Sequence, residues 1–378
     1  MKILFYLGHP AHFHLFKNII THLSVKNDIS ILTKKKDILD ELLNKSGFAY
    51  YNILPSGRKD SKFNIALGLI KRDYRMLKYC LKFKPDIMVG TSPEICHVGK
   101  FLNIPSINVN EDDANAVSLY AKMSYPFATD ILTPESCDNG KWNDKSIKYN
   151  SYHELAYLHP NVFNPDENVL KGYNIKKPYY ILRFSALNAY HDKGVKGIHK
   201  ELGLKIIDKL ITKGNIYITS ERKLEPEFEQ YQLNINPLDI YHIIYFSEMY
   251  IGDSQTMAAE SAVLGVPSLR FNDFAGRLGY LEELEKEYQL TFGFRTNNPV
   301  GLLTKIDELL NIKDIKQIWS DRRNKMLTEK IDTTKFFVWF IENYPDSKKI
   351  LKENPDYQYN FKIQPNDAEL SNILSNKK

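Results

Sequence analysis

Short, almost wholly apolar runs alternate with longer amphipathic segments through the first third of the chain. Apolar runs this short, bounded by polar loops, are typical of strands that are buried on both faces of a sheet. The predicted strands are residues 2–7, 28–32, 48–53, 86–90, 105–109 and 130–132. Helices are expected between them at about 15–23, 36–46 and 64–84. Two further helices are expected to end at residue 102 and at about residue 123. This alternation predicts an α/β fold with a parallel, doubly wound sheet, whose ligands bind at the carboxyl ends of the strands.

The same alternation returns after a proline-containing stretch at 151–177, which we interpret as a linker. Strands are predicted at 179–183, 215–219, 249–252 and 268–271. Helices are predicted at about 196–213, near 227, and at 240–246, 280–287, 300–310, 315–325 and 333–344. We therefore expect an N-terminal domain at 1–150, a second doubly wound domain at 178–330, and a C-terminal helix with a polar tail at 331–378 that is loosely attached after Pro355.

Composition narrows the class of protein. A hydrophobic content of 43% and a charged content of 26% are ordinary for a soluble globular protein. The formal net charge is +5, with scattered lysines, which suits anionic ligands or a weak attraction to a membrane surface and argues against nucleic-acid binding. The three cysteines form no CxxC pair, so structural zinc is not expected. We expect the N-terminal apolar run to be a strand and not a signal peptide, and we expect a cytoplasmic protein without a membrane span.

The stretch 251–269 carries the clearest chemical signal. It predicts the end of a strand, a tight turn and a short helix that begins near Ser254. A helix N-terminus has unpaired N–H groups and a partial positive charge, so it suits a phosphate, and the Ser254 and Thr256 hydroxyls add donors. Glu260 follows Thr256 by one helical turn, and its carboxylate suits ribose hydroxyls. The pattern indicates a nucleoside-diphosphate site; the alternative is a capped core helix with a solvated Glu260.

This stretch, DSQTMAAESAVLGVPSL, resembles the nucleotide-binding segment of the GT-B superfamily, which includes sugar-nucleotide glycosyltransferases and non-hydrolysing UDP-GlcNAc 2-epimerases. The resemblance implies two Rossmann-like domains that face a central cleft. It also implies that Ser254, Gln255 and Thr256 hold the diphosphate and that Glu260 holds the ribose. Gln255 and Thr256 depart from the glycines usual at these positions, so we expect a looser approach of the backbone to the phosphate.

Two further loops resemble a branch of predicted bacterial and archaeal glycosyltransferases related to the peptidoglycan N-acetylglucosaminyltransferase. They are PAHFHLF at 10–16 and RFSALNAYHD at 183–192, and the likeness extends through about Thr291. It implies that His12, on the loop after the first strand, takes the proton from the acceptor hydroxyl in an inverting transfer. His14 and His9 compete for this role. Helix capping or packing is the alternative for all three histidines.

The resemblance also assigns residues of the second domain to the donor. Arg183, Ser185 and His191 are expected to bind the diphosphate, because cations and hydrogen-bond donors stabilise a leaving UDP. An ion pair between Arg183 and Asp192 is the alternative. The expected contacts with the base and the donor sugar come from Asn236, Leu238 and Arg277, the last of which could equally be a surface charge.

The rim of the first domain carries carboxylates after its predicted strands. Glu94, Glu111 and Asp112 are candidates for binding the acceptor or for acid/base chemistry, and Glu111 is the one that we select. Capping of the following helices is the alternative. Residues 111–113 lack the spacing of a metal-binding Asp-x-Asp motif, and the superfamily usually works without metal, so we expect neither a metal nor another cofactor.

Three functions remain open at this point. The leading one is transfer of a sugar from a UDP-linked donor to a glycan or lipid-linked acceptor, with inversion. The second is a UDP-N-acetylhexosamine 2-epimerase, which Glu111 would suit, although Thr91 stands where that family would have an aspartate. The third is a non-catalytic subunit that binds a nucleotide-sugar. The basic helix at 71–84 suggests a peripheral membrane contact or, alternatively, a solvated amphipathic face.

Overall fold

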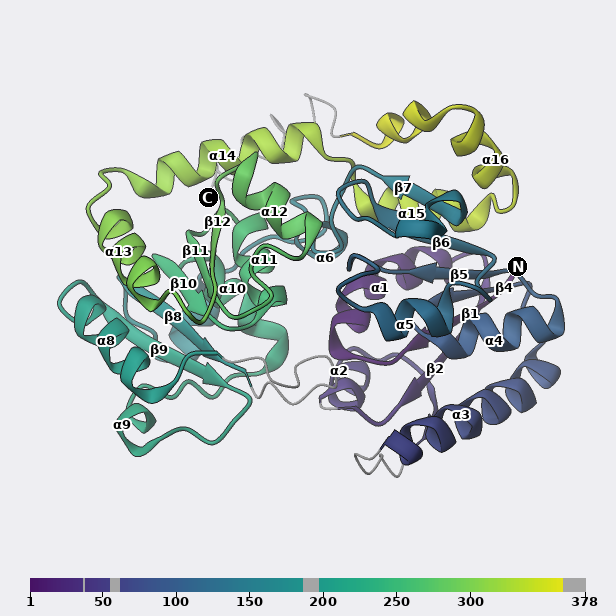
Figure 1. Cartoon of the computed structure of the whole chain (residues 1–378), viewed down its shortest axis with the longest axis horizontal. Helices are drawn as coiled ribbons and strands as arrows, with labels where there is room; N and C mark the ends of the chain where they lie inside the picture. The colour runs from purple at the N-terminus through teal and green to yellow at the C-terminus, as the bar shows by residue number, and fades with distance from the viewer. Residues whose placement is uncertain (37, 55–61, 186–196, 363–378) are drawn as a thin grey trace. The chain divides into compact units, whose positions relative to one another are not determined.

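The computed structural model describes residues 1–36, 38–54, 62–185 and 197–362, with only the backbone described at 62–67. The chain forms two compact units, each built around its own sheet (Figure 1). Unit 1 comprises Met1–Tyr157 together with the chain from Lys330 onward, and unit 2 comprises Leu158–Glu329. The stretch expected as a linker is therefore divided between the units, because Tyr152 and Leu155 are fully buried in unit 1.

The sheet of unit 1 is parallel throughout its described part, with the order β3-β2-β1-β4-β5-β6-β7. The strand order reverses between β1 and β4, and a crevice at such a reversal is where doubly wound sheets bind ligands. The bounds are β1 (Lys2–Leu7), β2 (Asp28–Lys34), β3 (Tyr51–Leu54), β4 (Ile87–Gly90), β5 (Ser106–Val109), β6 (Asp130–Pro134) and β7 (Ser146–Tyr149).

Helices follow the strands of unit 1, and α3 packs beside α4 (Figure 1). Their bounds are α1 (Pro10–Leu23), α2 (Leu39–Lys45), α3 (Lys62–Phe83), α4 (Pro93–Leu102), α5 (Ser118–Ser124), η1 (Gly140–Lys145) and the short α6 (Leu155–Leu158). The core between sheet and helices is formed by apolar side chains such as Leu4, Met76, Met88 and Ile95, none of which is exposed. These are the apolar positions from which the strands and helices were predicted.

The C-terminal segment completes unit 1. It forms α15 (Thr333–Glu342), α16 (Asp346–Glu353) and η4 (Pro355–Phe361), and α15 packs against α1. Trp339 of α15 stacks on Tyr357 with ring centroids 4.9 Å apart. The buried Gln358 side chain accepts a hydrogen bond from the Asn150 amide at 2.6 Å. The expectation of a loosely attached chain after Pro355 was therefore wrong up to residue 362, because these aromatic and amide side chains pack on the unit.

The sheet of unit 2 is also parallel, with the order β12-β11-β10-β8-β9 in the described residues. Its strands are β8 (Tyr179–Phe184), β9 (Asn215–Ser220), β10 (Met249–Gly252), β11 (Ser268–Phe271) and β12 (Thr291–Phe294). Its helices are α7 (Asn168–Gly172), α8 (Lys200–Leu210), α9 (Pro226–Glu229), η3 (Pro237–Asp239), α10 (Ile240–Tyr245), α11 (Gln255–Val263), α12 (Gly279–Lys286), α13 (Pro299–Leu310) and α14 (Ile315–Glu329).

These two parallel sheets confirm the predicted class of fold, but several boundaries were wrong. The first helix begins at Pro10, not near residue 15, so His12 and His14 lie on α1 and not on a loop. The reason is that His9 caps this helix and a proline at the first helical position is already in a helical conformation. Strands β7 and β12 and helix α16 were not predicted, since their short patterns are only partly apolar. None of the described helices is long and apolar enough for a membrane span.

His14 lies in the core of unit 1. Its side chain is 6% exposed and its ring packs 5.4 Å from the ring of Tyr157. Burial lowers the pKa of His14 from its ordinary value of 6.5 to about 3, with Lys17 and His9 adding to the effect. The imidazole is therefore neutral in the folded chain over a pH range in which the unfolded chain binds a proton.

We expect the His14→Gln variant to resist acid better than the native protein. Between pH 6.5 and about 3 the unfolded state binds more protons at His14, so the free energy of unfolding falls as the pH falls. Glutamine does not titrate, and the change should flatten this dependence by up to about 1 kcal/mol per pH unit. Urea denaturation at pH 7, 6 and 5 measures it. The exposed His22→Gln on the same helix is the control; equal slopes in all three proteins would contradict the prediction.

Candidate functional site

The N-terminus of α11 lies at the carboxyl end of β10, as predicted. Ser254 is the N-cap residue, and its hydroxyl accepts a hydrogen bond from the Met257 amide at 3.3 Å. Among the described residues, the backbone N–H groups of Gln255 and Thr256 have no acceptor within the protein. Unpaired N–H groups at the positive end of a helix dipole can bind an anion. At the other end of α11, Arg323 donates from Nε to the Val263 carbonyl at 2.8 Å.

The side chain of Gln255 is tied to the neighbouring strand. Its Nε2 donates to Oδ1 of Asn272, which follows β11, and Nδ2 of Asn272 donates to the Asp253 carbonyl at 2.8 Å. Asn272 is 1% exposed. The side chain that replaces a glycine of the superfamily pattern thus links the turn after β10 to the end of β11.

Asp253 is a buried carboxylate that the sequence analysis missed. One oxygen accepts from the Ser185 amide at 2.6 Å and the other from the Ile198 amide at 3.2 Å. Burial raises the pKa of Asp253, and these two amides act against that rise. The carboxylate therefore joins both ends of the loop after β8 to the turn before α11. Ser185 contacts this carboxylate with its backbone amide and its hydroxyl, and His191 lies outside the described residues.

Glu260 is buried, not solvated as the alternative interpretation required. Its side chain is 4% exposed, and Tyr241 of α10 donates its hydroxyl hydrogen to Oε1 at 2.8 Å. The turn into α10 contains Asn236, whose Oδ1 accepts from the Leu238 amide at 3.3 Å. Residues 236 and 238, expected at the base, therefore belong to the η3 turn that leads into α10, the helix whose Tyr241 holds the Glu260 carboxylate.

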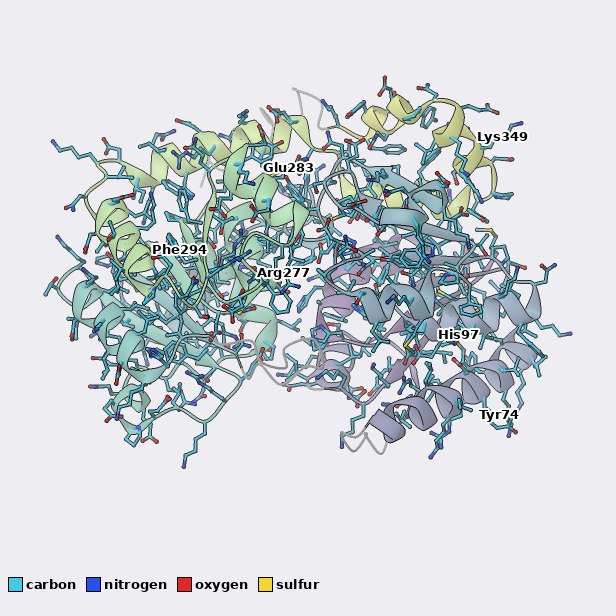
Figure 2. The ribbon with its side chains drawn as sticks, in the orientation of Figure 1. Tyr74, His97, Arg277, Glu283, Phe294 and Lys349 are labelled. Atoms are coloured by element: carbon cyan, nitrogen blue, oxygen red, sulfur yellow. The ribbon has the colours of Figure 1, made fainter. Side chains whose placement is uncertain are left out.

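The two predicted cationic contacts differ in their surroundings. Arg183 lies near the end of β8, with 17% of its side chain exposed, and its Nη2 pairs with Glu221, the residue that follows β9. Any side chain at Gly252 would collide with the Arg183 Cβ atom at 2.8 Å, so glycine allows the two strands to end close together. Arg277, which is labelled in Figure 2, is exposed, and its guanidinium lies 5.5 Å from the centroid of the Phe274 ring.

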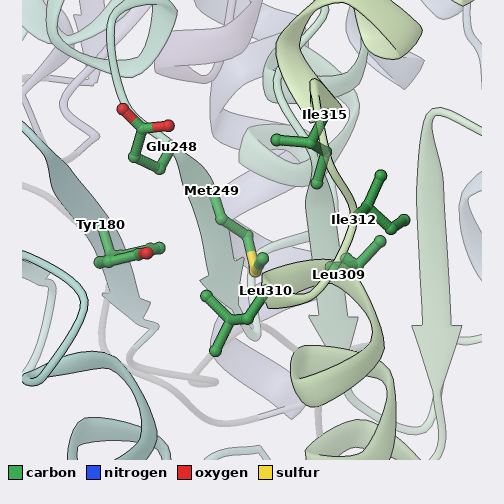
Figure 3. Close-up of a pocket in the computed structure, with 7 residues that line it drawn as sticks. All are labelled: Tyr180, Glu248, Met249, Leu309, Leu310, Ile312 and Ile315. Carbon is green, nitrogen blue, oxygen red and sulfur yellow. The ribbon is translucent and has the colours of Figure 1, made fainter.

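Two cavities of unit 2 lie at different ends of the sheet. One, of about 320 Å³, lies beside β12 and the turn after β11, and its lining includes Gly276, Glu285 and Arg295. The other, of about 140 Å³, is lined by Tyr180 and Met249 at the amino ends of β8 and β10 and by apolar residues of α13 and its surroundings (Figure 3). Because parallel sheets bind ligands at the carboxyl ends of their strands, only the first cavity adjoins the predicted rim.

His12 of unit 1 has a defined tautomer. Its Nδ1 accepts a hydrogen bond from the Gly8 amide at 3.1 Å. Burial, together with His9 and Lys34, holds the pKa of His12 well below its usual value, so the ring is neutral at pH 7. A neutral imidazole that accepts at Nδ1 carries its proton on Nε2. His12 is partly exposed, and this geometry favours a hydrogen-bond donor over the base that we expected.

Glu111 follows β5, with its Oε2 lying 3.3 Å from Nδ1 of His153. Burial lowers the pKa of His153 to about 3 despite the neighbouring Asp112, so at pH 7 this is a neutral ring against a carboxylate and not an ion pair. The Glu111 side chain is 18% exposed. From the sequence, His153 and Glu154 are ambiguous candidates, either for binding the acceptor and acid/base chemistry or for a structural role, and both side chains are buried.

Two further groups at the rim of unit 1, the predicted Glu94 and Thr91 at the place of the epimerase aspartate, are already engaged. Glu94 is 2% exposed and pairs with Arg72 of α3. Although burial opposes its ionisation, Arg72 and Lys34 hold the pKa of Glu94 below its usual value. Thr91 donates its hydroxyl to the Val109 carbonyl at 2.6 Å. Within the described ranges, no group of three or more His, Cys, Asp or Glu side chains is arranged for a metal ion.

Solved structures with similar folds bind nucleotides or carry glycosyltransferase names. S. aureus MnaA in complex with UDP has a TM-score of 0.66 at 13% identity, over 92% of this chain and 97% of that one. The UDP-GlcNAc 2-epimerase of Methanocaldococcus jannaschii, in complex with UDP-GlcNAc and UDP, has a TM-score of 0.59 at 16% identity, over 86% and 99%. The kitacinnamycin glycotransferase has a TM-score of 0.57 at 10% identity, over 90% and 98%. These likenesses establish the GT-B fold.

Sequence comparison gives the family. An uncharacterised protein of M. jannaschii is 27% identical to this chain over 203 residues. The match covers 49% of this chain and 57% of that relative, so the chain spans just over half of the relative's length. Residues 1–344 match the family described as "Protein of unknown function (DUF354)". With its GT-B fold and a match over most of its length, the chain belongs to the DUF354 family.

Proposed function

We propose that this protein is a glycosyltransferase that moves a sugar from a UDP-linked donor to a glycan or lipid-linked acceptor. The observation that carries the proposal is the buried Glu260 carboxylate, hydrogen-bonded to Tyr241, one turn after the unpaired amides that begin α11. A solvated surface helix has no need of such a buried carboxylate, because burying a charge is costly unless it is paired or binds a ligand.

In this proposal the donor diphosphate binds the amides of Gln255 and Thr256 and the Ser254 hydroxyl, and Glu260 accepts from the ribose hydroxyls. Arg183 would exchange its pair with the exposed Glu221 for a phosphate oxygen, and Ser185 and His191 would complete the site. Asn236 and Leu238 would contact the base and Arg277 the sugar. Similar folds that bind UDP and UDP-GlcNAc support the choice of ligand.

For the chemical step we assign proton acceptance to Glu111 and hydrogen-bond donation to His12. The acceptor oxygen bonds to the anomeric carbon as its proton passes to the Glu111 carboxylate. The bond from the anomeric carbon to the diphosphate oxygen breaks, and UDP leaves with the electron pair. Nε2–H of His12 would donate to a substrate oxygen. We retain inversion and independence of metal as parts of the proposal, and His14, in the core, has no role in it.

An epimerase is the second candidate, favoured by the partly exposed Glu111 and by the epimerases among the similar folds. Epimerisation removes the C2 proton and returns one to the opposite face, which calls for more than one acid/base group. At the rim, Glu94 is paired with Arg72, and Thr91, which replaces the aspartate of the epimerases, is bonded to a backbone carbonyl. Transfer needs one proton acceptor, so the rim suits transfer better.

The experiment that separates these functions is proton NMR of the protein with a panel of UDP-sugars in D2O. Slow release of UDP with unlabelled C2, or transfer to an added glycan, supports a transferase. Deuterium at C2 with a 2-epimer would identify an epimerase, and binding without turnover would identify a binding subunit. Repeating the assay with EDTA tests the independence of metal, and retained turnover is expected.

The Glu260→Gln variant should bind UDP about 10- to 100-fold more weakly. A charged acceptor contributes about 1.5–3 kcal/mol to a hydrogen bond, and about 1.4 kcal/mol is tenfold in affinity. Isothermal titration calorimetry measures the change. The half-buried Glu283→Gln on α12 is the matched control, and thermal unfolding checks that both variants fold. Equal affinities for UDP in the two variants would refute the role of Glu260.

Substitution of the two unit 1 residues distinguishes donor from base. Glutamine at position 12 can present an amide N–H near the place of Nε2, so His12→Gln should keep more activity than His12→Ala. Glu111→Gln, which cannot accept the proton, should lose about 100-fold or more in kcat. Initial rates with the donor found by NMR measure this. Equal loss in His12→Gln and His12→Ala, with Glu111→Gln active, would restore His12 as the base.

A further inference from the structure

Helix α3 exposes apolar side chains to solvent. Ile70, Tyr74 and Leu81 are 64%, 65% and 59% exposed. Their positions, i, i+4 and i+11, lie on one stripe of a helix with 3.6 residues per turn. Tyr74 is labelled on this helix in Figure 2. A surface helix of a soluble protein normally turns its apolar stripe toward the core.

The opposite side of α3 holds the helix on unit 1. Arg72, Met76 and Cys80 are buried, at 6%, 0% and 1% exposure, and Arg72 forms its ion pair with Glu94 of α4. These three residues repeat every fourth position, so they fix which side faces the sheet. The exposed stripe is therefore a second apolar surface. A merely solvated amphipathic face, the alternative interpretation, would carry polar side chains on this side of the helix.

Lysines lie beside the exposed stripe. Lys71, Lys78 and Lys82 are exposed and project from the same outward half of the helix. The only acidic residue between residues 68 and 84 is Asp73, and its carboxylate is paired with Nδ1 of His97 at 2.9 Å. We call this set of six exposed side chains, from Ile70 to Lys82, the α3 outer face. It combines apolar and tyrosine side chains with cations, and its charge is positive.

We propose that the α3 outer face docks on the surface of an anionic lipid bilayer. Ile70 and Leu81 would enter the boundary between headgroups and acyl chains, Tyr74 would keep its hydroxyl at the headgroup level, and the lysines would contact lipid phosphates. Charge complementarity selects a negative bilayer as the occupant of this face. Only the purpose of this contact, which is to bring the protein to a lipid-linked acceptor, rests on the proposed function.

Sedimentation with vesicles tests the proposal on the full chain. We expect binding to vesicles of phosphatidylcholine with phosphatidylglycerol, and weaker binding to phosphatidylcholine alone or in high salt. Ile70→Ser/Leu81→Ser and Lys71→Gln/Lys78→Gln/Lys82→Gln should each lower the partition coefficient at least tenfold. The substituted side chains are exposed, so folding should be unaffected. Thermal unfolding and UDP calorimetry of the same variants measure the fold and the nucleotide site separately from the membrane contact.

Matched changes in unit 2 provide the controls. Ile211→Ser/Val300→Ser removes apolar side chains that are 52% and 71% exposed, and Lys213→Gln/Lys223→Gln removes exposed lysines. These variants should bind vesicles as the native protein does. Equal loss in control and α3 variants, or no binding of the native protein to anionic vesicles, would overturn the proposal. A dimer in light scattering that Ile70→Ser/Leu81→Ser dissociates would assign the face to a second copy of the chain.

Discussion

Asp253, through its carboxylate and its backbone carbonyl, joins three strand ends in unit 2 into one rim. Its two oxygens accept from the amides of Ser185 and Ile198, and its own carbonyl accepts from Asn272 after β11. A buried carboxylate is costly without such partners, so the three segments are held in the arrangement that satisfies it. The N-cap of α11 follows immediately, so the contacts of Asp253 help to fix the position of the unpaired amides that begin this helix.

Unit 1 uses a backbone group in a comparable way. The Gly8 amide occupies Nδ1 of His12 and so determines which ring nitrogen carries the proton. The presence of a histidine at this place predicts proton chemistry. Whether the ring donates or accepts a hydrogen bond at the substrate depends on the Gly8 amide. Glu111, beside a neutral His153, keeps a carboxylate partly open to solvent. Together these contacts give a donor and an acceptor of defined type on the same unit.

The sequence was sufficient for the parallel sheets and for the helix after β10, because both depend on local patterns of apolar residues and on the chemistry of helix ends. It was insufficient where a side chain finds a distant partner. Tyr241 and Glu260 are 19 residues apart, and Arg72 and Glu94 are 22 residues apart. The local sequence around each carboxylate therefore does not show its partner. It does not show that Tyr241 orients Glu260 as a candidate ligand group, or that Arg72 neutralises Glu94. The start of α1 was missed because a histidine and a proline, residues common in loops, here cap and begin a helix.

The path of the chain has a consequence for synthesis. Unit 2 is formed by one continuous segment, whereas unit 1 is formed by the two ends of the described chain, with α15 packed against α1 and the Thr334 hydroxyl bonded to the Ala156 carbonyl at 2.8 Å. During translation the N-terminal sheet must therefore wait, with part of its apolar surface uncovered, until residues 333–362 have left the ribosome. Unit 2 can complete its core earlier. Unit 1 is thus completed after unit 2 has been synthesised, although its sheet is made first.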